Sequence, residues 1–96
     1  MLADVAALAT ARAYEEGAAA LVEDGAPAEA LFVVATGAMD LVHADTVVDV
    51  LEPGQCFGHP SLLTGLAPAF TVRAREPSTA ILLPRAAAMR VFAQRS

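Results

Sequence analysis

The chain has 96 residues, of which 56% are hydrophobic, and it carries a formal net charge of −5 with arginine as its only strongly basic residue type. This length corresponds to one small domain, and the acidic balance argues against a surface that binds nucleic-acid phosphates. Alanine supplies much of the hydrophobic share, and no apolar run approaches the ~18 residues that a membrane-spanning helix needs. We therefore expect a single cytoplasmic domain, residues 1–96, that is part of a longer chain and binds neither membranes nor nucleic acids.

The first half of the chain alternates short apolar segments with turn residues. The helical spacing of Leu2, Val5 and Leu8 predicts a short N-terminal helix that ends near Thr10. After this helix, β-branched and aromatic residues favour strands, and turns rich in glycine, proline and aspartate separate them. The predicted strands cover residues 11–15, 18–23, 30–35, 38–43 and 46–51.

The second half contains two further strands and a second terminal helix. Strict alternation predicts a strand over residues 70–75, and residues 79–83 form the next one before Pro84 interrupts it. Residues 85–94 are predicted to form a helix whose apolar side docks on the sheets. About eight short strands with regular turns are typical of an antiparallel sandwich or barrel. We expect a mainly β jelly roll with a helix at each end.

The stretch from Cys56 to Val72 has the residue pattern of a binding site. Gly58, Pro60 and Ser61 open a short apolar helical turn, and a second glycine- and proline-containing loop follows it. Glycine lets the backbone approach a ligand closely, and the free N–H groups at the start of a helix can bind an anion. The stretch therefore predicts a site for a small anionic ligand.

The same stretch, together with the turns before it, resembles a cyclic-nucleotide-binding domain. Glycines 17, 25, 37, 54 and 58 lie at the expected turns, and Pro53-Gly54-Gln55-Cys56-Phe57-Gly58 completes the pattern over essentially the whole chain. This resemblance implies a regulatory, non-catalytic jelly roll of the double-stranded β-helix type. It also implies that residues 57–71 form a phosphate-binding cassette built around a short helix. The implied ligand-binding residues are Phe57, Gly58, His59, Ser61, Leu62, Ala69 and Thr71.

The cassette departs from the family pattern at two charged positions. Family members that bind cyclic AMP or GMP usually carry a glutamate after Phe-Gly and an arginine that pairs with the cyclic phosphate. Here these positions are His59 and Pro68, and residues 67–70 contain no basic residue. Each charged hydrogen bond contributes roughly 1.5–3 kcal/mol, so losing two should weaken binding roughly a hundredfold to ten-thousandfold. We therefore expect no tightly bound cofactor; the backbone N–H groups of Ser61 and Ala69 could hold a cyclic nucleotide weakly, or another nucleotide or small anion.

The cassette sequence also resembles one branch of the family. Phe-Gly-His-Pro-Ser-Leu-Leu-Thr-Gly, followed by Pro-Ala-Phe-Thr-Val-Arg-Ala, is similar to the N-terminal module of bacterial signal-transduction proteins with paired CBS domains and a nucleotidyltransferase-like region. This resemblance implies a sensing module whose partners are other domains of the same chain. The alternative is a ligand-free jelly roll that serves dimerisation, as a homodimer, or domain docking.

The histidines and Ser61 do not form a catalytic or metal-binding pattern. His43 shares a strand face with Met39 and Leu41, so we expect it to have a structural role. Two histidines without a His-x-His pair do not make a cupin-type metal centre, so no metal site is expected. Ser61 has no glycine elbow and no evident base beside it, so we expect no catalytic residue and no enzyme activity.

The remaining candidates are two arginines and one cysteine. Arg73 and Arg75 share one strand face and could replace the missing cassette arginine, but exposure to solvent or pairing with Glu76 is the simpler expectation. Cys56 is the only cysteine, which excludes an intramolecular disulfide. A reactive thiol is one reading of Cys56, and we expect instead a small buried side chain.

Overall fold

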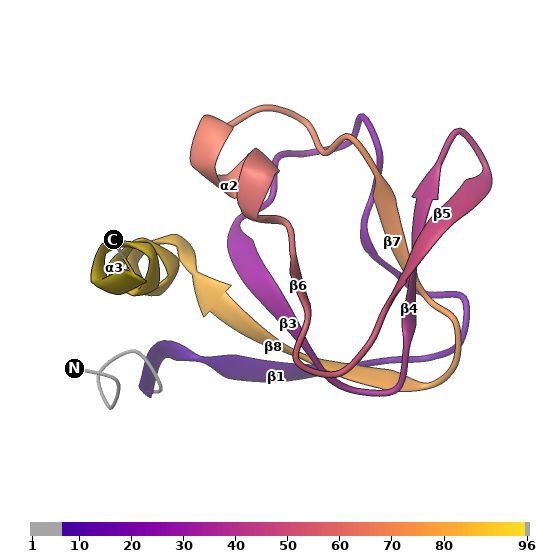
Figure 1. Cartoon of the computed structure of the whole chain (residues 1–96), viewed down its shortest axis with the longest axis horizontal. Helices are drawn as coiled ribbons and strands as arrows, with labels where there is room; N and C mark the ends of the chain where they lie inside the picture. The colour runs from indigo at the N-terminus through magenta and orange to yellow at the C-terminus, as the bar shows by residue number, and fades with distance from the viewer. Residues whose placement is uncertain (1–6, 96) are drawn as a thin grey trace.

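The protein is a two-sheet antiparallel roll, described by a computed structural model over residues 7–95 (Figure 1). One sheet has the strand order β1-β8-β3-β6, and the other has the order β2-β7-β4-β5. The strands are β1 (Thr10–Tyr14), β2 (Ala19–Leu21), β3 (Ala30–Thr36), β4 (Met39–His43), β5 (Thr46–Leu51), β6 (Cys56–Phe57), β7 (Thr71–Ala74) and β8 (Ser78–Pro84). The helices are α2 (His59–Thr64) and α3 (Arg85–Arg95). This architecture confirms the predicted mainly β jelly roll.

The predicted element boundaries agree with the structure except at a few positions. Most of the predicted N-terminal helix lies outside the described residues; Ala7 and Leu8 are helical, and β1 begins at Thr10. The two-residue strand β6 was not predicted. Strand β2 is only three residues long, because its pairing with β7 is irregular between Ala19 and Leu21.

The core lies between the two sheets and follows from the alternation of side chains along each strand. In β3, Ala30, Phe32 and Val34 belong to this core, whereas Leu31 points to the other face. Apolar residues of the other strands in both sheets complete this core: Tyr14, Met39, Leu51, Phe57, Val72, Ala74, Ala80 and Leu82. The cassette begins at β6 and ends at β7, so it connects the two sheets.

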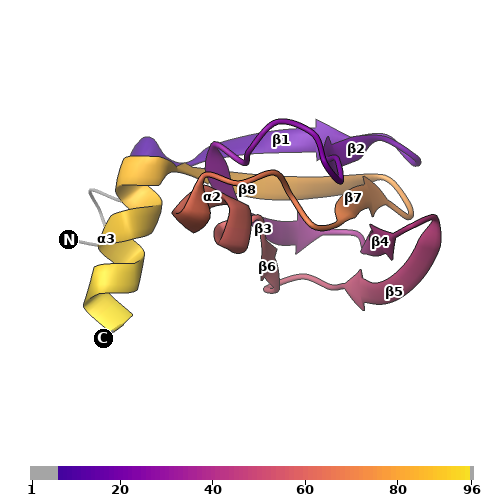
Figure 2. The same cartoon turned by 90° about the horizontal axis from the view of Figure 1, so that it is seen from above.

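A second apolar cluster attaches both helices to the outer side of β3. Leu62 of α2 and Ala88 of α3 pack with Leu31, and the Arg85 guanidinium donates a hydrogen bond to the carbonyl of Leu62. Figure 2 shows α3 at the end of the roll, where β8 leads into it. The predicted docking of this helix on the roll is confirmed. Within the described part of the chain, no helix is both long and apolar enough to cross a membrane.

The expected burial of Cys56 is wrong. Cys56 is exposed, because side chains of β6 alternate and the neighbouring Phe57 takes the inward position. Strand β6 also lies at the edge of its sheet.

Candidate functional site

The cassette starts from a rigid aromatic contact. Phe57 of β6 pairs with Phe32 of β3, and their rings stack with centroids 4.7 Å apart. Gly58 follows in the left-handed backbone region, with φ of 88°. A Cβ on Gly58 would lie 3.0 Å from the Phe32 ring and 3.2 Å from the carbonyl oxygen of Ala30. The position therefore requires glycine for both its backbone angle and its lack of a side chain.

Helix α2 places His59 at its first residue and Pro60 at the next. Pro60 lacks an N–H group, which at this position would have no partner within the helix. The His59 ring is half-buried, and its Nδ1 atom is buried without a hydrogen-bond partner in the described structure. Any hydrogen bond from this ring to a ligand must therefore come from Nε2.

The two predicted hydroxyl residues bind the segment between β2 and β3, residues 22–29, which we call the β2–β3 segment. The Ser61 hydroxyl accepts a hydrogen bond from the Ala28 N–H (2.9 Å) and donates one to the carbonyl of Leu66. The Thr71 hydroxyl accepts from the Glu23 N–H, also at 2.9 Å. Both hydroxyls therefore hold the shape of the cassette.

The loop between α2 and β7 is attached to the same segment through its backbone. The Asp24 N–H donates to the Pro68 carbonyl at 2.9 Å. In a planar trans peptide the N–H points opposite to the carbonyl, so the Ala69 N–H points away from Asp24. Ala69 is exposed, which leaves this N–H near the surface.

His43 supports the neighbouring peptide, in agreement with its expected structural role. Its Nδ1 atom lies 3.3 Å from the Ala69 carbonyl oxygen and 3.4 Å from the Glu23 carboxylate. Both neighbours are acceptors, so Nδ1 carries the hydrogen. The ring of Phe70 meets the His43 ring edge-on, with centroids 5.7 Å apart, and remains 38% exposed.

Some of the predicted site residues make contacts within the protein, and the others remain available to a ligand. Phe57 and Leu62 are buried in the two apolar clusters, and Ser61 and Thr71 make the hydroxyl contacts above. The predicted ligand groups that these contacts do not use are the Gly58 backbone, the His59 ring and the backbone N–H groups of Ser61 and Ala69.

The two arginines considered as substitutes for the cassette arginine, Arg73 in β7 and Arg75 directly after it, have different surroundings. Arg75 pairs with Asp40 at 2.6 Å, and not with Glu76 as one alternative predicted. Arg73 is exposed and lines a hollow with Glu23, Asp24 and Asp45 and with Thr71, one of the predicted site residues. Arg75 is held by its ion pair, whereas Arg73 lies beside the predicted site among three carboxylates.

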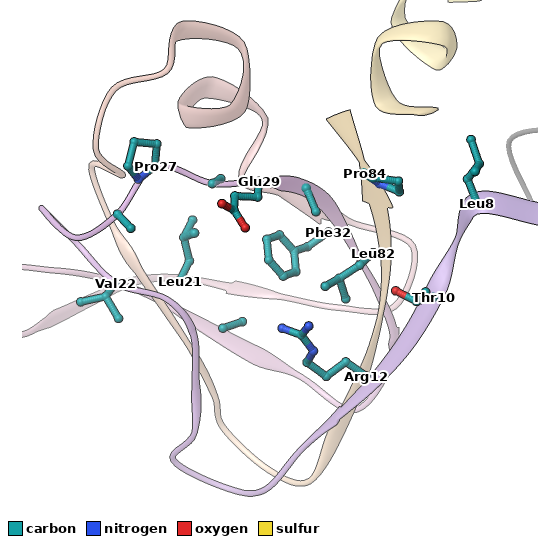
Figure 3. A pocket seen from close by; sticks show the side chains of 14 residues that line it. Leu8, Thr10, Arg12, Leu21, Val22, Pro27, Glu29, Phe32, Leu82 and Pro84 are labelled. Carbon is teal, nitrogen blue, oxygen red and sulfur yellow. The ribbon is translucent and has the colours of Figure 1, made fainter. Parts of the chain in front are cut away.

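A separate cavity of about 560 Å³ lies between β1, β8 and β3 on one side and β2 with the β2–β3 segment on the other (Figure 3). None of its described lining residues belongs to the cassette. Its two charged residues, Arg12 and Glu29, were missed by the sequence analysis. The signal for Arg12 was available, because Thr10, Arg12 and Tyr14 alternate along β1 and Tyr14 is buried. In residues 7–95 no group of three or more His, Cys, Asp or Glu side chains could hold a metal ion.

We expect Ser61→Ala to lower the free energy of unfolding by about 1–3 kcal/mol, because the buried Ala28 N–H loses its acceptor. Hydrogen exchange should show faster exchange of the Ala28 amide. The control is Thr64→Ala, which removes an exposed hydroxyl from the same helix and should cost at most about 0.5 kcal/mol. Equal exchange rates for Ala28 in the two variants would contradict the role given to Ser61.

Residues 8–95 match the family model described as the cyclic nucleotide-binding domain. A search of curated proteins gives no match. Among solved structures, the Thermus thermophilus catabolite activator protein is 22% identical over 97% of this chain and 46% of that chain, with a TM-score of 0.81. A structure described as Sp-2Cl-cAMPS bound to PKAR CBD2 is 21% identical over 95% of this chain and 62% of that chain, with a TM-score of 0.85.

The regulatory subunit of a cAMP-independent protein kinase A from Trypanosoma brucei is 20% identical over 96% of this chain and 38% of that chain, with a TM-score of 0.79. The chain thus spans less than two thirds of each of these structures. At these identities the likeness establishes the shared fold.

Proposed function

The chain belongs to the cyclic nucleotide-binding domain family, and from this membership we propose that it is a regulatory module that senses a small anionic ligand at its cassette. The observation that carries the proposal is the orientation of the Ala69 peptide. The Asp24 N–H holds the Pro68 carbonyl, so the Ala69 N–H points away from the β2–β3 segment. The glycine at position 58 keeps the other side of the cassette free of a side chain.

We further propose that the module does not bind cyclic AMP tightly. His59 and Pro68 provide neither the carboxylate nor the guanidinium of the family pattern, and Arg75 is paired with Asp40. The remaining donors are backbone N–H groups and the His59 ring, which suit an anion without specifying a ribose. The proposed ligand is therefore a nucleotide or another small anion with an altered contact at His59.

The proposed setting is a bacterial signal-transduction protein in which the module regulates other domains of the same chain. The similarity of the cassette sequence to the module that precedes CBS domains supports this setting. Helix α3 is the element through which such domains would be linked, because it packs on α2 through Leu62 and Ala88.

A second candidate is a ligand-free jelly roll used for dimerisation or domain docking. It is favoured by the exposed apolar side chains beside α2, where Leu63 is 44% and Leu66 is 68% exposed. The two candidates differ in whether any small anion binds saturably to the isolated domain.

Calorimetric titration with cyclic mono- and dinucleotides, ATP and AMP tests the first candidate. We expect saturable binding of at least one compound, and His59→Ala should weaken it roughly tenfold because one charged or polar hydrogen bond is lost. Glu16→Gln, at an exposed turn, is the matched control and should leave the affinity unchanged. Absence of both heat and thermal shift across the panel would support the ligand-free alternative.

A gain-of-function variant provides the complementary test. His59→Glu combined with Pro68→Arg restores both charged groups and should raise the affinity for cyclic AMP roughly a hundredfold or more. The two single variants, each with one restored group, should fall between wild type and the double variant. A correctly folded double variant with no gain would show that the cassette no longer has the family's binding shape.

A further inference from the structure

The cavity of Figure 3 is separate from the cassette and has the size of a small-molecule site. Its volume of about 560 Å³ lies within the roughly 300–1,000 Å³ of ligand pockets. Most of its wall is apolar, and Leu21, Phe32 and Leu82 form part of the wall. Phe32 and Leu82 also belong to the core, so this part of the wall is held in place by the packing of the two sheets.

Arg12 places a positive charge beside this apolar wall, and the residue is exposed to solvent. In the β1–β8 pairing Arg12 lies opposite Ala80, which has no exposed surface, so Arg12 is on the inward face of β1. Figure 3 shows its guanidinium directed into the cavity. Among residues 7–95, no hydrogen bond or ion pair involves this group. An inward-pointing charge on an edge strand can also serve to prevent that strand from pairing with a strand of another molecule. This alternative role would not require a second, opposite charge in the same cavity.

Glu29 supplies the second charge. It lies at the end of the β2–β3 segment, and Figure 3 shows its carboxylate in the cavity near Phe32. In the described structure Glu29 also has no hydrogen-bond or ion-pair partner. Glu29 is exposed, as Arg12 is. The cavity is therefore open to solvent at both charges, and it presents one cation and one anion that do not pair with each other beside an apolar wall.

We propose that this cavity binds a small zwitterion with an apolar body, of the class that apolar dipeptides represent. The Arg12 guanidinium presents parallel N–H donors that match a carboxylate. The Glu29 carboxylate accepts hydrogen bonds only, which matches an ammonium group. The apolar body packs on Leu21, Phe32 and Leu82. This site is independent of the anion site proposed at the cassette.

Titration of the 96-residue chain with the dipeptide Leu-Leu, followed by NMR, tests the proposal. We expect saturable shifts of the Arg12 and Phe32 amides. N-acetyl-Leu-Leu, which lacks the ammonium group, and Leu-Leu amide, which lacks the carboxylate, should each bind roughly tenfold more weakly. Lack of saturation by Leu-Leu at about 10 mM would overturn the proposal.

Two variants assign the ends of the ligand. Arg12→Gln should lower the affinity for Leu-Leu roughly tenfold, and it should not lower the affinity for Leu-Leu amide, which lacks the carboxylate. Glu29→Gln should likewise lower the affinity for Leu-Leu roughly tenfold, and it should not lower the affinity for N-acetyl-Leu-Leu, which lacks the ammonium group. Arg73→Gln, at an exposed arginine on the other sheet, should leave all affinities unchanged. His59→Ala should also leave Leu-Leu binding unchanged, which separates this site from the cassette. Equal losses in all four variants would overturn the proposal.

Discussion

Replacing Gly37 with alanine is expected to lower the free energy of unfolding by about 3–5 kcal/mol. Gly37 has φ of 85°, where an L side chain costs about 1–2 kcal/mol of backbone strain. An added Cβ would also lie 2.3 Å from the Ser78 hydroxyl and 2.7 Å from the Pro77 carbonyl oxygen. The second contact involves backbone, so relief requires movement of the turn before β8.

The Ser78 hydroxyl adds to this cost, since it accepts a hydrogen bond from the Ala38 N–H at 3.1 Å and is part of a buried residue. Urea unfolding with an unchanged m-value would measure the loss. Gly54→Ala is the matched control, because Gly54 has φ of 93° but no atom within 4 Å of an added Cβ. It should cost only the strain of about 1–2 kcal/mol. Equal losses in the two variants would show that the contacts with Pro77 and Ser78 carry no cost.

Leu62→Ala is expected to lower the free energy of unfolding by about 2–5 kcal/mol. The variant loses the apolar contacts of the removed atoms, and it leaves a cavity where they were. Leu62 is 2% exposed and packs between β3 and α3, so the variant should also loosen the contact of α3 with the roll. Chemical denaturation measures the stability, and faster amide exchange in α3 measures the loosening.

The neighbouring residue provides a close control for this prediction. Leu63 lies on the same helix and is 44% exposed, so Leu63→Ala should change the stability by at most about 0.5 kcal/mol. If the two variants lost stability equally, the second apolar cluster would not be what attaches α2 and α3 to the sheet.

Most of the fold could be predicted because strands and turns leave local signals. The run Ala30–Thr36 and the strictly alternating segment before Arg75 both contain enough residues to show a period. Strand β6 has two residues, too few for a period, so both the strand and the exposure of Cys56 were missed.

The site was predictable in position but not in its contacts. Ser61 and Ala28 are 33 residues apart, and Thr71 and Glu23 are 48 apart, so their hydrogen bonds exist only after the two sheets have formed. The same holds for Arg12 and Glu29, which share a cavity through the packing of β1 beside the β2–β3 segment. Local sequence patterns carry no information about such pairs.

The way the cassette is attached separates its shape from its selectivity. The hydroxyls of Ser61 and Thr71 and the backbone carbonyl of Pro68 bind the β2–β3 segment. A backbone carbonyl is present at position 68 whatever the side chain of that residue. The side chains at positions 59 and 68 take no part in these three bonds. Substitution at either position therefore leaves these three bonds in place, and the remaining constraint is the space around the buried Pro68. A lineage of such domains can change the compound it recognises through these positions while the attachment of the cassette is kept.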